Sequence, residues 1–196
     1  YTWRKMNPNW EYRYENAEER RKTVERLEPR LLAAYDRCEK PYQADIWRYL
    51  VVYENGGVYV DMDTVSTYPL DKMINFYHGE DIMVSPPVIN YFTNHKHQID
   101  KAIEDKNTYF INNFAFAAVK NSKNLRKIID AEIEDEPKRI EQLKNSPKPI
   151  AINLSGHFYR VLKEEDSISY NFICANHSGT HKNLSFEDKS YNYDII

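Results

Sequence analysis

The chain has 196 residues, enough for one domain with a full hydrophobic core. Its net charge of −3, with basic residues scattered among acidic ones, argues against a nucleic-acid-binding protein. No apolar run approaches the roughly 20 residues that cross a bilayer, so we expect no transmembrane segment.

The two cysteines, Cys38 and Cys174, are far apart in the sequence and form no CxxC pattern. We therefore expect two separate thiols in a reducing compartment rather than a disulfide framework. This favours a soluble, cytoplasmic domain over one in a Golgi-type lumen. Because the chain begins with Tyr1 and not Met, a segment upstream of it is also expected.

Helical and extended patterns alternate along much of the chain. They predict helices over 17–27, 29–35, 41–54, 124–144 (interrupted by Pro137) and 155–163, and strands over 58–60, 81–85, 109–117, 149–153 and 167–174. The tail from Asn176 is predicted to be irregular. Strands separated by helices imply an α/β domain with a mixed, mostly parallel central sheet flanked by helices.

An acidic pair follows the first predicted strand. The chain has only five glycines, and two of them, Gly56 and Gly57, stand between a predicted helix and the strand that ends in Asp61-Met62-Asp63. Residues i and i+2 of an extended chain point to the same side about 7 Å apart, so both carboxylates are expected to project together. Such a pair can share a hard divalent cation, Mn²⁺ or Mg²⁺, with open positions for a diphosphate. A solvated turn is the alternative interpretation of these residues.

The helix before the acidic pair carries Asp45 and Arg48, three residues apart and therefore on one face. An ordinary intrahelical ion pair explains this spacing. A functional interpretation is also open, in which a carboxylate beside a cation holds the hydroxyl groups of a sugar, although the spacing alone slightly favours the ordinary ion pair.

The run ADIWRYLVVYENGGVYVDMD resembles the DXD-motif sugar-binding glycosyltransferases, a family that includes the yeast-type initiating α-1,6-mannosyltransferases. The family pattern is an Ala-Asp pair, an Arg-Tyr pair, an apolar helix, Gly-Gly, a strand and Asp-x-Asp, and each part is present in order. The resemblance extends over about residues 3–72, and it includes Asn-Pro-x-Trp-x-Tyr at 7–12. It implies a single GT-A-like catalytic domain over 1–196, with the family's first nucleotide-binding strand upstream of the chain.

The resemblance also implies a reaction and a set of site residues. The reaction is transfer of a hexose, with retention of configuration, from a UDP- or GDP-linked donor to a hydroxyl acceptor such as a glycan. No catalytic nucleophile or base can be assigned. The implied metal ligands are Asp61, Asp63 and His177, and the implied donor-binding residues are Asp45, Arg48, Asp61, Asn113, Gly156, Thr180 and His181. His181 stands where the family carries Trp, and His157 stands where it carries Pro.

Two other functions remain open for the acidic pair. VYVDMDTV also fits a phosphatase of the haloacid dehalogenase type, with Asp61 as nucleophile. However, some 60 residues precede the motif, and no later Gly-Asp-x-x-x-Asp pair completes that kind of metal site. The second alternative is a catalytically silent carbohydrate-binding domain.

Overall fold

The computed structural model describes residues 2–66, 68–76, 79–84, 88–89, 109–110, 113–144, 158, 161–162, 168–169, 175–176 and 193–195. The helices are α1 (Thr2–Met6), α2 (Ala17–Leu27), the 3₁₀ turn η1 (Pro29–Leu31), α3 (Leu32–Tyr35), α4 (Lys40–Asn55), α5 (Leu70–Met73) and α7 (Lys123–Lys144). The strands are β1 (Arg13–Tyr14), β2 (Gly57–Asp61), β3 (Thr64–Val65), β4 (Ile82–Val84), β5 (Val88–Ile89), β6 (Tyr109–Phe110), β7 (Ala115–Ala118), β8 (Ile168–Ser169), β9 (Ala175–Asn176) and β10 (Tyr193–Ile195). No helix in these described ranges is long and apolar enough to cross a membrane.

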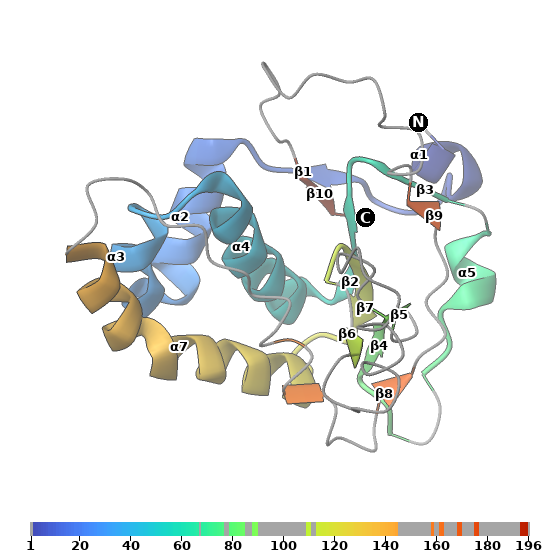
Figure 1. Ribbon diagram of the computed structural model, residues 1–196. Helices are drawn as coiled ribbons and strands as arrows, with labels where there is room; N and C mark the ends of the chain where they lie inside the picture. Colours follow the sequence, from blue (N-terminus) through green and yellow to red (C-terminus); the bar gives the residue numbers. More distant parts are fainter. Residues whose placement is uncertain are drawn as a thin grey trace.

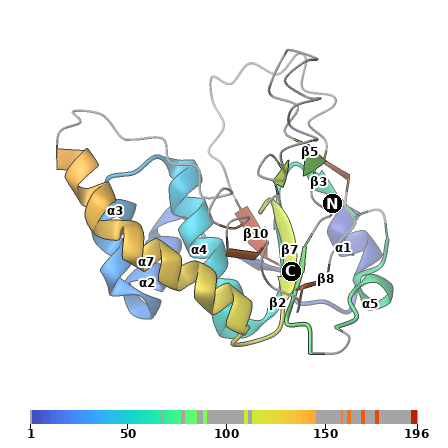
Figure 2. The same ribbon diagram turned by 60° about the horizontal axis from the view of Figure 1, so that its bottom comes forward.

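A mixed sheet with strand order β1-β10-β2-β7-β4-β8 separates two groups of helices. Figures 1 and 2 show α2, α3, α4 and α7 together on one side, with α1 and α5 on the other. The expected α/β domain with a mixed sheet flanked by helices is thereby confirmed, and it is consistent with a GT-A-like domain.

The expectation of a mostly parallel sheet is wrong for the strands that the structure describes. Of the pairings in this sheet only β4 with β8 is parallel, whereas β2 runs antiparallel to both of its neighbours, β10 and β7. Parallel neighbours need a crossover connection, usually a helix. The helices α2, η1, α3 and α4 all lie between β1 and β2 in the chain, but β10 separates these two strands in the sheet, so this connection gives no parallel neighbouring pair.

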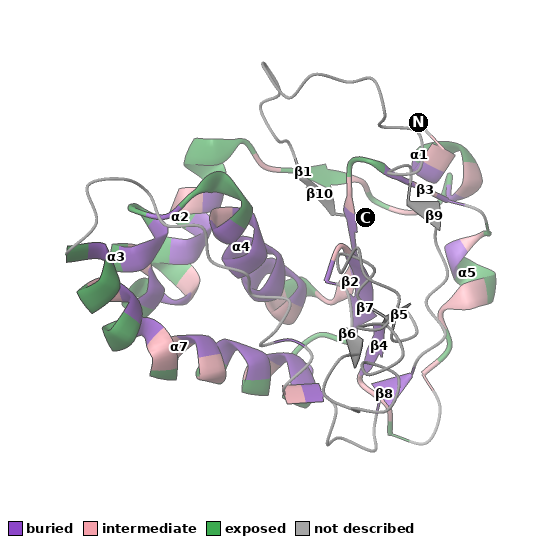
Figure 3. Cartoon of the chain, in the orientation of Figure 1, coloured by how far each residue is buried: buried purple, intermediate pink, exposed green. Residues whose placement is uncertain are grey.

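Two core clusters lie on the two faces of the sheet. Along β2, Tyr59 joins the cluster shared with the large helices, while Val58 and Val60 join the cluster that contains Trp3 of α1. This alternation is the period of two of a β-strand. Figure 3 shows α4 and the central strands β2, β7 and β4 as the most continuously buried elements. A residue at position 61 of the strand therefore shares the α4 side with Tyr59.

The local signals predicted the helices of the N-terminal half well. Asn16 caps α2 by accepting hydrogen bonds from the backbone N–H groups of Glu18 and Glu19, and the Glu19 carboxylate accepts one from the backbone N–H of Asn16. At the other end of the helical region, α7 continues through Pro137, where an interruption was expected. Pro137 is exposed, and the buried face continues on both sides of it at Glu136 and Arg139, so packing outweighs the lost hydrogen bond.

Candidate active site at the end of β2

The reversal between α4 and β2 determines which parts of the two elements meet. Gly56 ends α4 with φ of +71°, and its N–H donates to the carbonyl of Val52 at 2.8 Å. From Arg48 to the end of α4 is about 10 Å of helix. From Gly57 to Asp61 is about 13 Å of strand. The middle of α4 therefore lies level with the end of β2.

Arg48 is a buried cation between two carboxylates. Its Nη2 lies 3.0 Å from Asp45 Oδ1, and its Nη1 lies 3.4 Å from Asp61 Oδ1. Nη1 also donates to the backbone carbonyl of Asn113 at 2.7 Å, and Cζ lies 4.3 Å from the centre of the Tyr59 ring. The expected ion pair between Asp45 and Arg48 is present, and it points inward to the acidic pair rather than outward to solvent.

Asn113 joins the same group from the start of β7. Val60 pairs with Ala115, and the N–H of Asp61 donates to the carbonyl of Phe114 at 2.7 Å, so Asn113 lies just beyond the β2–β7 ladder. Its Nδ2 donates to Asp45 Oδ1 at 3.0 Å and to the Tyr49 hydroxyl at 2.7 Å. Four of the residues expected in the site (Asp45, Arg48, Asp61 and Asn113) thus form one connected cluster.

Burial raises the pKa values of both carboxyl groups in the cluster. Burial raises the pKa of Asp45 to about 6, against the attraction of Arg48. Burial also raises the pKa of the Asp61 carboxyl; Arg48 and the Tyr59 hydroxyl oppose this rise, and the Asp63 carboxylate adds to it. Burial is therefore the main cause of both rises, and a divalent cation with oxygen ligands would oppose it by stabilising the charged carboxylates.

The two acidic residues differ in their surroundings. The strand ends at Asp61, and Met62 and Asp63 form an exposed turn in which the Thr64 hydroxyl donates to the carbonyl of Asp61 at 2.6 Å. The strand spacing expected between Asp61 and Asp63 is therefore wrong, because this hydrogen bond closes the turn. Asp63 is nevertheless near enough to Asp61 to raise its pKa. Asp61 thus has a half-buried carboxylate that Arg48 and Tyr59 contact, whereas Asp63 is exposed to solvent.

The backbone of β9 lies next to this turn. Thr64 pairs with Asn176 and Val65 pairs with Ala175 in an antiparallel ladder. The residue before Thr64 is Asp63, and the residue after Asn176 is His177. His177, Gly156, Thr180 and His181 themselves lie outside the described residues. Within the described ranges, no group of three His, Cys, Asp or Glu side chains is placed to hold a metal ion.

Tyr59 and Tyr49 are site residues that the sequence reasoning missed. The Tyr59 hydroxyl donates to Asp61 Oδ1, while the Tyr59 ring lies against Arg48. The spacing of two residues in a strand could have identified Tyr59 as a neighbour of Asp61 on the same face. Tyr49 belongs to the Arg-Tyr pair of the family pattern, but its contact with Asn113, 64 residues away, has no signal in the local sequence.

Much of this cluster lies in the part of the chain that matches a known protein family. Residues 1–80 match the family described as "glycosyltransferase sugar-binding region containing DXD motif", and the match includes Asp45, Arg48, Asp61 and Asp63. The resemblance seen in the sequence is thereby confirmed for this part of the chain.

A similar curated protein is the initiation-specific α-1,6-mannosyltransferase of Candida albicans (strain SC5314 / ATCC MYA-2876). It is 33% identical over 78 residues, which are 38% of this chain and 20% of the mannosyltransferase. The aligned part thus spans about a fifth of the length of that relative. Both matches support a glycosyltransferase.

Proposed function

We propose that this chain carries the donor-binding and metal-binding region of a glycosyltransferase. It moves a hexose from a UDP- or GDP-linked donor to a hydroxyl group of a glycan. The observation that carries the proposal is the arrangement at the end of β2. Arg48 and Tyr59 hold Asp61 from the α4 side, and Asp63 follows it on an exposed turn.

The acidic turn is the proposed metal site. Asp63 is the principal ligand of Mn²⁺ or Mg²⁺, Asp61 shares the cation directly or through water, and His177 completes the set. The raised pKa of Asp61 supports this assignment, as does the pairing of Thr64 with Asn176, the residues adjacent to Asp63 and His177. The cation supplies charge stabilisation to the nucleoside diphosphate as it leaves.

The α4 side of the cluster is the proposed donor-sugar site. Asp45 accepts hydrogen bonds from sugar hydroxyl groups, and the Asn113 amide keeps its carboxylate in place from the other side. The guanidinium of Arg48 already contacts both carboxylates, so its main part is to hold them in position beneath the sugar. Gly156, Thr180 and His181 are proposed as further donor contacts on the strength of the family resemblance.

Because the similar Candida albicans protein is named a mannosyltransferase, mannose is the first donor sugar to test. Thermal unfolding with Mn²⁺, GDP-mannose and UDP-glucose, separately and together, tests the proposal. A ligand that binds only the folded state raises the melting temperature. We expect a rise when Mn²⁺ and the matching donor are both present, and a much smaller rise with either alone.

Two results, read from activity assays beside the thermal unfolding, contradict the proposal. Hydrolysis of a generic aryl phosphate that Asp61→Asn abolishes would identify a phosphatase with Asp61 as nucleophile. No response to metal and donor, together with no turnover, would identify a catalytically silent domain.

A further inference from the structure

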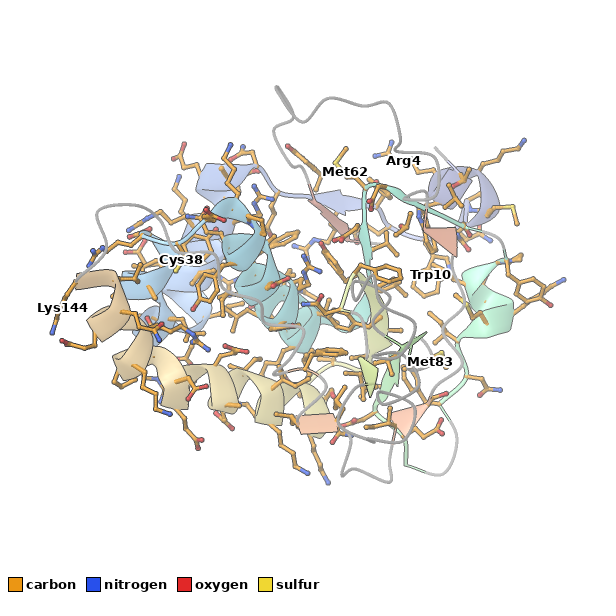
Figure 4. All side chains as sticks on the ribbon, viewed as in Figure 1. Arg4, Trp10, Cys38, Met62, Met83 and Lys144 are labelled. Atoms are coloured by element: carbon orange, nitrogen blue, oxygen red, sulfur yellow. The ribbon has the colours of Figure 1, made fainter. Side chains whose placement is uncertain are left out.

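A pocket lies on the opposite side of the sheet from Asp45 and Arg48. It has a volume of about 310 Å³ and is lined by Arg4, Asn7, Pro8, Trp10 and Tyr12, between α1 and β1. This volume is at the small end of the roughly 300–1,000 Å³ of ligand pockets. Figure 4 marks Arg4 and Trp10, as well as Met62 in the acidic turn. None of the pocket residues has a part in the donor and metal site proposed above.

The pocket combines flat aromatic surface with hydrogen-bond donors. The guanidinium carbon of Arg4 lies 4.2 Å from the centre of the Tyr12 ring. Arg4 is exposed, and among the described residues no carboxylate forms an ion pair with it. Its N–H groups are therefore available to a ligand that lies in the pocket, while Tyr12 fixes the plane of the guanidinium.

The other walls of the pocket are held rigidly. The Trp10 indole N–H donates to Asp71 Oδ1 at 2.7 Å, which fixes the plane of the indole ring. The Asn7 side chain donates to the carbonyl of Trp3 at 2.9 Å and accepts from the N–H of Leu70 at 2.7 Å. A site whose groups are fixed before binding loses little conformational entropy when it binds.

Direct hydrogen bonds connect α1, which contributes Arg4 to the pocket, to the residues that follow Asp63. The Trp3 indole N–H donates to the Thr64 hydroxyl at 3.1 Å, and that hydroxyl donates to the carbonyl of Asp61 at 2.6 Å. The N–H of Ser66 also donates to the Thr2 hydroxyl at 3.1 Å. Arg4 follows Trp3 in α1, so the pocket has a fixed position relative to Asp61.

We propose that this pocket binds a sugar unit of the glycan acceptor, at a distance along the glycan from the hydroxyl that reacts. This inference rests on the proposed function. The proposed donor-binding residues lie on the α4 side of the sheet, so a pocket on the α1 side suits the glycan acceptor rather than the nucleotide-sugar donor. An aromatic ring contacts the apolar face of a sugar, and the N–H groups of a guanidinium donate to the oxygen atoms of its hydroxyl groups.

The proposal predicts a dependence on the length of the acceptor. Transfer should be measured with a mannotriose acceptor and with methyl α-mannoside for the wild type, Arg4→Ala, Arg4→Lys and Lys5→Ala. Lys5 is the matched control, because it is an exposed basic residue of α1 that does not line the pocket. We expect Arg4→Ala to raise KM for mannotriose about tenfold, the typical effect of losing a charged hydrogen-bond donor. KM for methyl α-mannoside and donor hydrolysis without acceptor should be unchanged.

Arg4→Lys distinguishes a sugar from an anion. A lysine retains the charge but loses the planar fork, so KM for mannotriose should rise nearly as far as with Arg4→Ala. Full rescue by Arg4→Lys, or competition by inorganic phosphate, would show an anion site and overturn the proposal. Equal KM values for mannotriose in Arg4→Ala and Lys5→Ala would overturn it as well.

Direct binding separates this proposal from the proposed function. Trp3 and Trp47 are buried, so Trp10 is the tryptophan whose fluorescence responds to a ligand in the pocket. Mannotriose should change the fluorescence without metal or donor, and Arg4→Ala should abolish the change. If the chain binds mannotriose in this way but transfers no sugar, the proposed function fails while the pocket assignment stands. If mannotriose does not bind to the wild type, the pocket assignment fails.

Discussion

Arg48 of α4 and Asp61 of β2 meet at 3.4 Å across the reversal between the helix and the strand. The contact connects the most buried helix to the first carboxylate of the acidic turn, and Asp45 shares the same guanidinium at 3.0 Å. Because both elements flank Gly56-Gly57, the local geometry of that reversal sets the position of the site.

Arg48→Met should destabilise the protein strongly. The Arg48 side chain is 4% exposed, and its removal leaves Asp45 and Asp61 without their buried cation. Removing one partner from a buried ion pair costs about 3–5 kcal/mol. Urea unfolding measures the change, and adding Asp45→Asn to Arg48→Met should recover part of it. A loss below about 1 kcal/mol, the size typical of a surface pair, would contradict the account.

Tyr59→Phe should weaken metal binding with little loss of stability. The ring against Arg48 is kept, and only the hydroxyl that donates to Asp61 is lost. Loss of a group that orients a metal ligand typically costs about 10–100-fold in affinity. Titration of Mn²⁺ in the presence of a nucleoside diphosphate measures the effect. Tyr49→Phe is the matched control, because it removes a hydroxyl that contacts Asn113 rather than Asp61. Equal Mn²⁺ affinities in the two variants would show that Tyr59 does not position the ligand.

Gly56→Ala should be more destabilising than Gly79→Ala. Both glycines have positive φ, +71° and +86°, which costs a residue with a Cβ roughly 1–2 kcal/mol. At Gly56 the added Cβ also lies 2.8 Å from the backbone nitrogen of Lys120, whereas at Gly79 nothing lies within 4 Å. Denaturant midpoints of the two variants give the difference. Equal losses of stability in the two variants would show that the close approach of the added Cβ to Lys120 does not destabilise the protein.

The thiol of Cys38 should react slowly in the native protein. Cys38 is buried and free, and burial raises the pKa of its thiol to about 11. The thiolate is the reactive form, so little of it is present near pH 8. In a Cys174→Ser variant, Ellman's reagent should label Cys38 rapidly in urea and very slowly without it. Rapid labelling in both conditions would contradict the burial of Cys38 behind α3 and α4.

Local signals in the sequence were sufficient for the elements that build the site. The helical pattern over 17–27 and the glycine pair after Asn55 marked the bounds of α2 and the end of α4 closely, and the resemblance identified Asp45, Arg48, Asp61 and Asp63. These features depend on neighbours within a few residues, which a sequence pattern captures.

Contacts between segments far apart in the sequence could not be predicted from such local patterns. The tail was expected to be irregular, yet β9 pairs with β3 and β10 pairs with β2. A strand of two or three residues carries too little periodicity to be recognised alone, and its partner determines whether it forms. The inward direction of the Asp45–Arg48 pair likewise depends on the start of β7, more than 60 residues further along the chain.

The metal site that we propose at the acidic turn is essential to the transfer of sugar from a nucleotide-sugar donor. Its most direct test is the rate of Mn²⁺-dependent turnover of the donor by the wild type, Asp63→Ala and Glu134→Ala. Glu134 is the control because it is an exposed acid on α7, in the helical layer. Loss of a metal that contributes several kcal/mol predicts a decrease of at least about 100-fold for Asp63→Ala, with Glu134→Ala unchanged. If Asp63→Ala retains the metal-dependent rate of the wild type, the claim is wrong.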